Sequence, residues 1–223
     1  MKAMPATRTI HRRVIALCAA FALAHSAHAS EFSAEIVSRD AAGSPVGVPA
    51  KIYVSNRLVR IETPEAADGF FLIDADAGVA RFILPRQRAV MAARQSSRLT
   101  QVFVAIDAGD PCRQWRAAAI DARGPGAAAD WRCERTEEHI ADGRGVVGYR
   151  VAAADTAAGL RWVDAGLGFP VKLSAADGTS ASLERIRVAA QPAELFTVPA
   201  GFRSFDPQAL IERIKHSDVW VDP

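Results

Sequence analysis

The sequence contains few residues that could carry chemistry. It has three cysteines and five histidines among 223 residues, and three of the histidines, His11, His25 and His28, lie near the start. The other two, His139 and His216, are isolated and make a poor metal site. The sequence has no Gly-x-Ser-x-Gly elbow, no His-Glu-x-x-His helix and no Gly-x-x-x-x-Gly-Lys-Ser/Thr loop. We therefore expect no catalytic residue, no metal and no cofactor.

Basic residues and a short apolar run open the chain. The run covers residues 14–24, and the small-x-small site Ala27-His28-Ala29 follows it. Four basic residues precede the run: Lys2, Arg8, Arg12 and Arg13. The run is about half the roughly 20 residues that span a bilayer, so a retained anchor is the weaker interpretation. The layout predicts a signal peptide over 1–29, cleaved near Ala29, and a single periplasmic domain over 30–223.

Removing the signal peptide reverses the sign of the net charge. It would take away four of the 27 basic residues and none of the 25 acidic ones. The remaining 223 − 29 = 194 residues then carry 23 basic and 25 acidic groups, a net charge of −2. The length suits one domain with a sizeable core. A basic surface for nucleic acid is not implied, so we expect no nucleic-acid partner.

The cysteines indicate a disulfide in an oxidising compartment. Cys112 and Cys133 remain as an even pair once the signal peptide is gone, and they predict a structural disulfide. The spacing is not Cys-x-x-Cys, which argues against a redox-active pair. Lipidation of Cys18 would need a small residue before it, and Leu17 is not small.

Short alternating or apolar segments separated by turns predict a β-meander. Residues 70–74 and 79–84 are apolar on both faces, which indicates either strands covered by a helix or the wall of a cavity. Short turns between the segments favour one large antiparallel sheet over parallel βαβ units. The expected strands cover residues 31–38, 51–55, 58–62, 70–74, 79–84, 89–92, 130–135, 146–151, 160–164, 169–173 and 181–188.

The hairpin over residues 160–173 is the most distinctive of these. Its sequence is Leu-Arg-Trp-Val-Asp-Ala-Gly-Leu-Gly-Phe-Pro-Val-Lys-Leu. Gly166 and Gly168 are expected to supply the positive φ angles of a tight reversal. Pro170 has no N–H and indicates the start of a strand.

Three helices are predicted. Leu99, Val102, Phe103 and Ile106 have the i, i+3, i+4, i+7 spacing of an apolar stripe, with Ser96 or Ser97 as a cap. That stripe is either ordinary core or a lid over a pocket. Pro111 opens a second helix, and Pro207 opens a third one near the end of the chain.

Some polar groups could act without a motif. Three acidic pairs are candidates for a glycosidase-like site: Glu137 with Glu138, Asp74 with Asp76, and Asp107 with Asp110. A cluster of arginines could bind an anion: Arg81, Arg86, Arg88 and Arg94. Such groups more commonly form solvated turns, strand faces or ion pairs.

The order of elements resembles the periplasmic lipoprotein-carrier superfamily, the LolA/LolB-like fold. Three stretches carry the resemblance: Lys51-Ile52-Tyr53-Val54 with Val59-Arg60-Ile61-Glu62; Arg161-Trp162-Val163-Asp164 with Gly168-Phe169-Pro170-Val171; and Phe196-Thr197-Val198-Pro199-Ala200-Gly201-Phe202. It implies an α+β, mainly β fold: a curved antiparallel half-barrel with helices covering the concave face, followed here by the C-terminal helix. It also implies that Arg60 helps hold a lid closed.

The hypothesis is a monomeric carrier that binds lipid or an acylated protein in an apolar cavity. The residues expected to line that cavity are Ile52, Val54, Val59, Ile61, Phe71, Ile73, Phe82, Met91, Leu99, Phe103 and Trp162. The alternative is an envelope interaction or sensor domain, binding another envelope protein, in which the same residues form a filled core. An unrecognised hydrolase is the third class.

Overall fold

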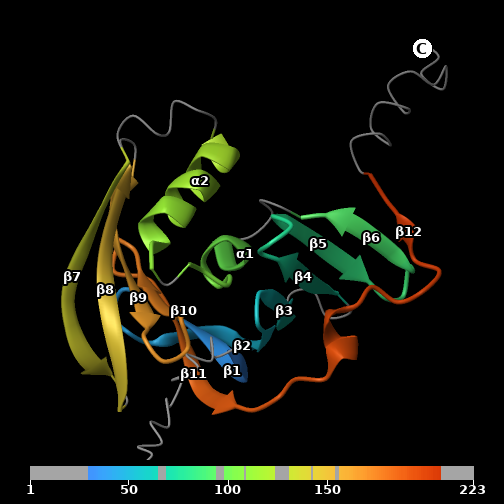
Figure 1. Cartoon of the computed structure of the whole chain (residues 1–223), viewed down its shortest axis with the longest axis horizontal. Coiled ribbons are helices and arrows are strands. Elements are labelled where there is room, and N and C mark those ends of the chain that lie inside the picture. The colour runs from blue at the N-terminus through green and yellow to red at the C-terminus, as the bar shows by residue number, and fades with distance from the viewer. Residues whose placement is uncertain are drawn as a thin grey trace, which may run out of the picture.

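The computed structural model describes residues 30–64, 69–93, 98–107, 109–123, 131–141, 143–153 and 156–206. Within these residues the protein is mainly β, with one open, curved sheet of 12 strands (Figure 1). The strands are β1 (Glu31–Arg39), β2 (Pro45–Ser55), β3 (Leu58–Glu62), β4 (Phe70–Asp74), β5 (Val79–Leu84), β6 (Ala89–Ala92), β7 (Arg132–Ala141), β8 (Arg144–Ala153), β9 (Thr156–Asp164), β10 (Phe169–Ser174), β11 (Ser180–Val188) and β12 (Arg203–Ser204). The helices are α1 (Arg98–Val102), α2 (Pro111–Arg123) and the 3-10 helix η3 (Ala193–Phe196).

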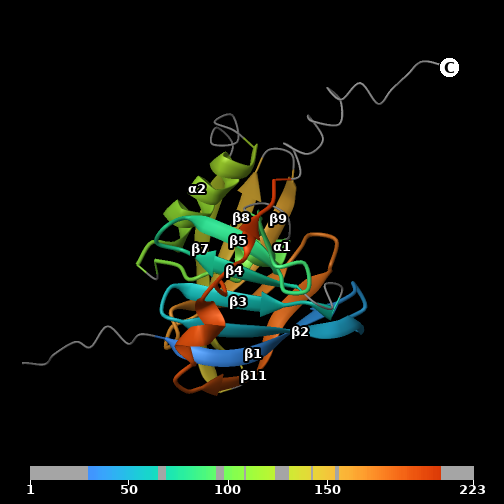
Figure 2. The ribbon, with the colours of Figure 1, turned by 90° about the vertical axis from the view of Figure 1, so that its right-hand side faces the viewer.

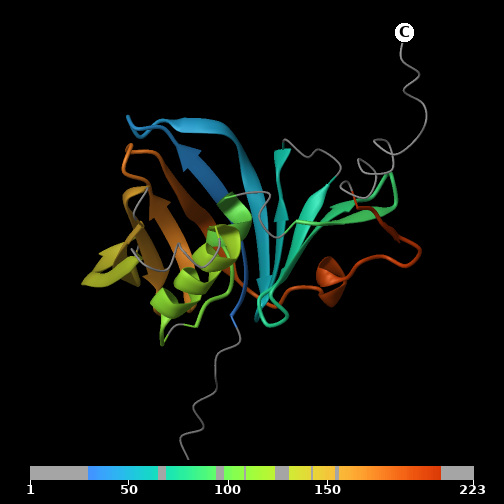
Figure 3. The ribbon, with the colours of Figure 1, turned by 90° about the horizontal axis from the view of Figure 1, so that it is seen from above.

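The sheet has two arms that meet at β1. Its order is β12-β6-β5-β4-β3-β2-β1-β11-β10-β9-β8-β7, and every neighbour pair is antiparallel except β12 with β6. β1 pairs with β2 on one side and with β11 on the other. The predicted meander is therefore confirmed. Its two halves are joined because the first long strand, β1, pairs with the last long strand, β11. Figure 3 shows the arms from above, with α1 and α2 between them.

The hairpin of β9 and β10 forms as predicted, with one difference. Gly168 has φ of 59°, but Gly166 is not in the positive-φ region, so one glycine suffices for the reversal. Pro170 lies opposite Val163 next to a register shift, which accommodates the missing N–H within the strand.

Asp164 holds this turn together from inside. Its Oδ1 accepts hydrogen bonds from the backbone N–H groups of Gly166 and Leu167, both at 2.8 Å, and its Oδ2 accepts one from Arg144 at 3.0 Å. The Asp164 side chain is only 2% exposed. Asp74 makes the same pair of bonds, to the N–H groups of Asp76 and Ala77, in the more exposed turn between β4 and β5.

We expect Asp164→Ala to lower the free energy of unfolding by about 2 kcal/mol, because the buried N–H of Leu167 is left without an acceptor and Arg144 loses its partly buried partner. Urea denaturation measures the change. Asp74→Ala is the matched control, since water can replace its carboxylate, and it should cost less than half as much. Equal losses for the two variants would contradict a special role for the buried turn.

The first helix is shorter than predicted. α1 ends at Val102, so Phe103 and Ile106 follow the helix instead of lying on it. The β-branched Val102 and Val104 disfavour helix continuation, which explains the early end. The second helix begins at Pro111 as predicted. The proposed cap at Ser96 or Ser97, the third helix and the signal peptide all lie outside the described residues.

The outer face of the β4 and β5 strands is covered by the chain after β11. Phe70, Leu72 and Ile83 form a small buried cluster, against which Val90 and Phe202 pack. Figure 2 shows the segment leading to β12 crossing this side of the sheet. The apolar character of both faces of residues 70–74 thus reflects a strand covered by an irregular segment, not by a helix.

Candidate functional site

A continuous apolar stripe crosses one arm of the sheet. Ile52 lies opposite Ile61, Ile61 opposite Phe71, Phe71 opposite Phe82, and Phe82 opposite Met91. Residues directly opposite in an antiparallel pair share a face, so one residue from each of β2 to β6 contributes to the stripe. The stripe is the surface on which any apolar ligand of the predicted kind would lie.

Most of the predicted lining residues belong to one packed cluster. Ile52, Val54, Val59, Ile61 and Phe103 are each 0% exposed, and Phe71 and Ile73 belong to the same buried cluster. Phe82, Leu99 and Trp162 are partly buried and pack against it. Met91 is partly buried and is not a member. Phe103, at the end of α1, therefore packs in one cluster with the stripe residues of β2, β3 and β4.

Trp162 lies on a different face of the sheet from Val163. Val163 belongs to a second cluster with Trp115 of α2, whereas Trp162 lies opposite Lys172 and Gly148. The Lys172 Nζ is 5.0 Å from the centroid of the Trp162 ring, within reach of a cation–π interaction. Trp162 and Lys172 line a groove of about 780 Å³ over β7 to β11.

The groove is rich in basic side chains. Three arginines line it, and each makes an ion pair: Arg39 with Glu184, Arg144 with Asp164, and Arg185 with Glu35. These carboxylates largely offset the charges of the three arginines. The positive charge left in the groove is therefore that of Lys172, beside the indole of Trp162. The groove thus offers a mixed polar and apolar surface, separate from the stripe.

Arg60 is placed on the face away from α1. Its guanidinium donates to Glu62 at 2.8 Å and to the carbonyl oxygen of Leu195 at 3.2 Å, and it lies 3.4 Å from the centroid of the Phe70 ring. Strand alternation explains the placement, because Ile61 and Val59 face the core. The contacts of Arg60 fasten η3 to β3 instead of holding α1 against the sheet.

Most members of the acidic pairs have structural partners. Asp74 caps its turn, Asp76 pairs with Arg57, and Glu138 pairs with Arg135. Of the arginine cluster, Arg81 and Arg86 are exposed and Arg94 lies outside the described residues. Among the residues that the structure describes, no three His, Cys, Asp or Glu side chains gather as metal ligands would. No described helix is long and apolar enough to cross a membrane.

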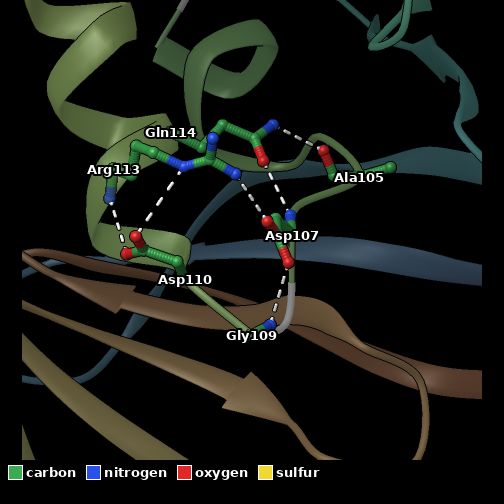
Figure 4. Close-up of polar contacts among 6 residues, drawn as sticks. All are labelled: Ala105, Asp107, Gly109, Asp110, Arg113 and Gln114. Atoms are coloured by element: carbon green, nitrogen blue, oxygen red, sulfur yellow. Dashed lines mark hydrogen bonds and ion pairs between the residues drawn. The ribbon is translucent and has the colours of Figure 1, made fainter.

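The connector between α1 and α2 is a hydrogen-bonded clamp (Figure 4). Gln114 Nε2 donates to the carbonyl oxygen of Ala105 at 2.8 Å, and its Oε1 accepts from the N–H of Asp107 at 2.7 Å. Arg113 donates to Asp107 at 2.8 Å, and Asp110 accepts from the N–H of Arg113 at 3.0 Å. The clamp lines a pocket of about 580 Å³ together with Ile106 and Arg57. It ties the residues after α1 to the first turn of α2.

The clamp should persist to low pH. Hydrogen bonds from the N–H of Gly109 and from Arg113 lower the pKa of Asp107 from its ordinary value of 3.8. A carboxyl group whose pKa is depressed by folding stabilises the fold above its unfolded pKa, and this contribution is lost as pH falls through the folded pKa. We expect the Asp107 carboxyl ¹³C shift to titrate with a midpoint below 3.8. A midpoint at or above that value would contradict the clamp, and Asp107→Asn assigns the signal.

The underside of α2 holds a polar arrangement that the sequence did not reveal. Trp115 is 2% exposed, and its Nε1 is buried without a hydrogen-bond partner in the described structure. The Cζ of Arg161 lies 4.7 Å from the centroid of the Trp115 ring, and Tyr149 meets that ring edge-on. Burial lowers the pKa of Arg161 to about 10. The Arg-Trp-Val-Asp motif contained this arginine, but only the pairing with α2 gives it an environment.

The Cys112–Cys133 disulfide is confirmed, and it joins α2 to β7 with a Cα–Cα distance of 5.7 Å. Both cysteines pack against the cluster that contains Trp115. The disulfide therefore fixes the start of α2 beside the strands that carry Tyr149 and Arg161.

Comparison with known proteins shows likeness in structure alone. No family model and no curated protein matches the sequence. PNGF-II matches with 6% identity over 84% of this chain and a TM-score of 0.52, but the match spans only 34% of PNGF-II. An uncharacterized conserved protein from Thermus thermophilus matches with 11% identity over 80% of this chain and 91% of that one, with a TM-score of 0.47.

A LolA superfamily protein, NE2245 from Nitrosomonas europaea, matches with 13% identity and a TM-score of 0.36. The match covers 76% of this chain and 91% of that one. At these identities a match concerns the fold and not the activity.

Proposed function

We propose that this protein is exported to the periplasm and encloses an apolar ligand, a lipid or the acyl chain of a lipoprotein, between the sheet and its helices. The observation that carries the proposal is the stripe from Ile52 to Met91, which spans five strands. α1, a helix of only five residues, and the residues that follow it lie between the arms. The disulfide is consistent with export.

The mechanism is displacement of α1 and Phe103 by the ligand, without covalent chemistry. Withdrawing a buried phenylalanine from the core costs about 2–3 kcal/mol, whereas an acyl chain contributes about 0.8 kcal/mol for each methylene that it buries. A chain of about ten methylenes therefore outweighs the opening. The strands need not move, because their backbone pairing does not depend on Phe103.

Native mass spectrometry of protein purified from a periplasm, together with uptake of a dansyl-labelled undecanoic acid, tests the proposal. We expect co-purified lipid or a saturable rise in dansyl fluorescence. A protein with neither property is not a carrier.

A second function is favoured by the complete burial of the lining residues. Five of them are 0% exposed, as in a filled core that needs no ligand. In that case the protein is an envelope interaction domain, and the groove beside Trp162 and Lys172 is the surface open to a partner. Failure of dansyl uptake, combined with weaker partner capture by Trp162→Ala, would support this function over the first.

A further inference from the structure

Arg161 and Trp115 form a pair in which two polar groups lack an ordinary partner. Arg161 is partly buried, and Trp115 is fully buried. A cation in such a place is commonly paired with an anion, and a buried indole N–H normally has an acceptor. Within the described part of the chain, no carboxylate pairs with the guanidinium of Arg161, and its contact is with the face of the Trp115 ring. The Nε1 of the same ring is the buried donor without an acceptor.

We propose that Arg161 and the Trp115 Nε1–H bind the carboxylate of a free fatty acid whose chain occupies the apolar stripe. One carboxylate oxygen would accept from the guanidinium, and the second would accept the indole N–H. A carboxylate satisfies both groups at once, because it is acceptor-only and offers two oxygens. This inference rests on the proposed function and names the ligand class.

The position of the pair fits a ligand that enters beside α2. Ile106 packs in the same cluster as Trp115 and also lines the pocket of about 580 Å³ between α2 and the turns at Arg57 and Ala75. The pocket therefore borders the cluster that contains the unpaired donor. Phe103, which packs against the stripe, lies three residues before Ile106, so displacement of this segment opens both regions together.

The charge environment favours an anion over a neutral headgroup. Partial burial of the guanidinium beside the Trp115 ring makes its interaction with a carboxylate stronger than the same interaction in water. A neutral alcohol accepts only one weaker hydrogen bond, so it leaves the cation uncompensated. The site should therefore discriminate between two ligands that share a chain and differ in the headgroup.

Calorimetric titration with decanoate and with 1-decanol at neutral pH tests the inference. We expect decanoate to bind at least about tenfold more tightly than 1-decanol. Arg161→Gln should remove this preference and leave the affinity for 1-decanol unchanged. Trp115→Phe keeps an aromatic ring at this position but removes the indole N–H together with part of the bicyclic ring, and should reduce the preference several-fold; the affinity for 1-decanol reports the effect of the lost packing. Near-ultraviolet circular dichroism establishes that each variant is folded.

Arg150→Gln is the matched control, because Arg150 is an exposed arginine of β8 that follows Tyr149 and points to the opposite face. It should leave the preference intact. Equal binding of decanoate and 1-decanol would overturn the inference and keep the proposed function. A preference that survives both Arg161→Gln and Trp115→Phe would also overturn the inference. Absence of binding of either compound would overturn the proposed function itself.

Discussion

Phe103→Ala should lower the free energy of unfolding by about 3–5 kcal/mol, the range for removing a fully buried aromatic side chain. Phe103 is 0% exposed and packs against the stripe. Truncation removes the free energy gained by transferring the phenyl ring from water to the core. It also leaves a cavity that the paired strands cannot close. Urea denaturation monitored by tryptophan fluorescence measures the change. In a carrier the same variant should also take up the dansyl-labelled acid faster, because the displaced group is smaller.

Met91→Ala is the control for this prediction. Met91 lies opposite Phe82 on the same stripe, but it is only partly buried and lies outside the packed cluster. Its truncation should cost less than half as much. A Phe103→Ala loss no greater than that of Met91→Ala would mean that Phe103 does not close the core. Faster uptake with a large stability loss would fit a lid, and slower or unchanged uptake would fit a permanent core residue.

Removal of the disulfide should lower the free energy of unfolding by about 3 kcal/mol. Cys112 and Cys133 are 21 residues apart, and closure of a loop of this size restricts the unfolded chain by about that amount. The Cys112→Ala, Cys133→Ala double variant should also loosen α2, since the bridge joins its first turn to β7. Chemical denaturation gives the size of the effect, and hydrogen exchange of the α2 amides shows where it acts.

The reduced wild-type protein provides the comparison for the double variant. If the effect comes from the cross-link, reduced protein and double variant should unfold at the same urea concentration. A double variant as stable as the oxidised protein would show that packing around Trp115 alone holds α2. Protection lost equally in β2 and α2 would indicate a global effect without a local role for the bridge.

Local patterns were sufficient to predict the disulfide and eleven of the twelve strands. The short strand β12 was missed, and β2, β7, β8 and β9 are longer than predicted. Alternation of Ile52 and Val54 with polar residues, and of Val59 and Ile61 with Arg60 and Glu62, defines which side chains face the core. Turn chemistry supplied the hairpin boundaries, as at Gly168. The even pair of cysteines in a chain expected to be exported predicted their bond. Each of these inferences depends on residues close in sequence or on a composition rule.

Periodicity was less reliable where two tendencies compete. Leu99, Val102, Phe103 and Ile106 have helical spacing, yet α1 ends at Val102. β-branched residues at 102 and 104 oppose the helix, and burial of Phe103 against the sheet is compatible with an irregular segment. Tertiary packing decided where the helix ends in this stretch. The spacing of residues in one sequence does not show how strong that packing is compared with local helix propensity.

By itself, the sequence determined which side chains share a strand face and which two cysteines bond, because both follow from short-range geometry and residue type. Only the tertiary structure decided what those faces meet. The motif Arg161-Trp162-Val163-Asp164 shows the difference. Alternation sends Arg161 and Val163 to one face, but α2, distant in sequence, places Trp115 over Arg161. Asp164 closes its own turn, whereas Trp162 lies beside Lys172 of the neighbouring strand in the groove. Contacts between elements far apart in the chain arise when the sheet curves, and no local pattern encodes them.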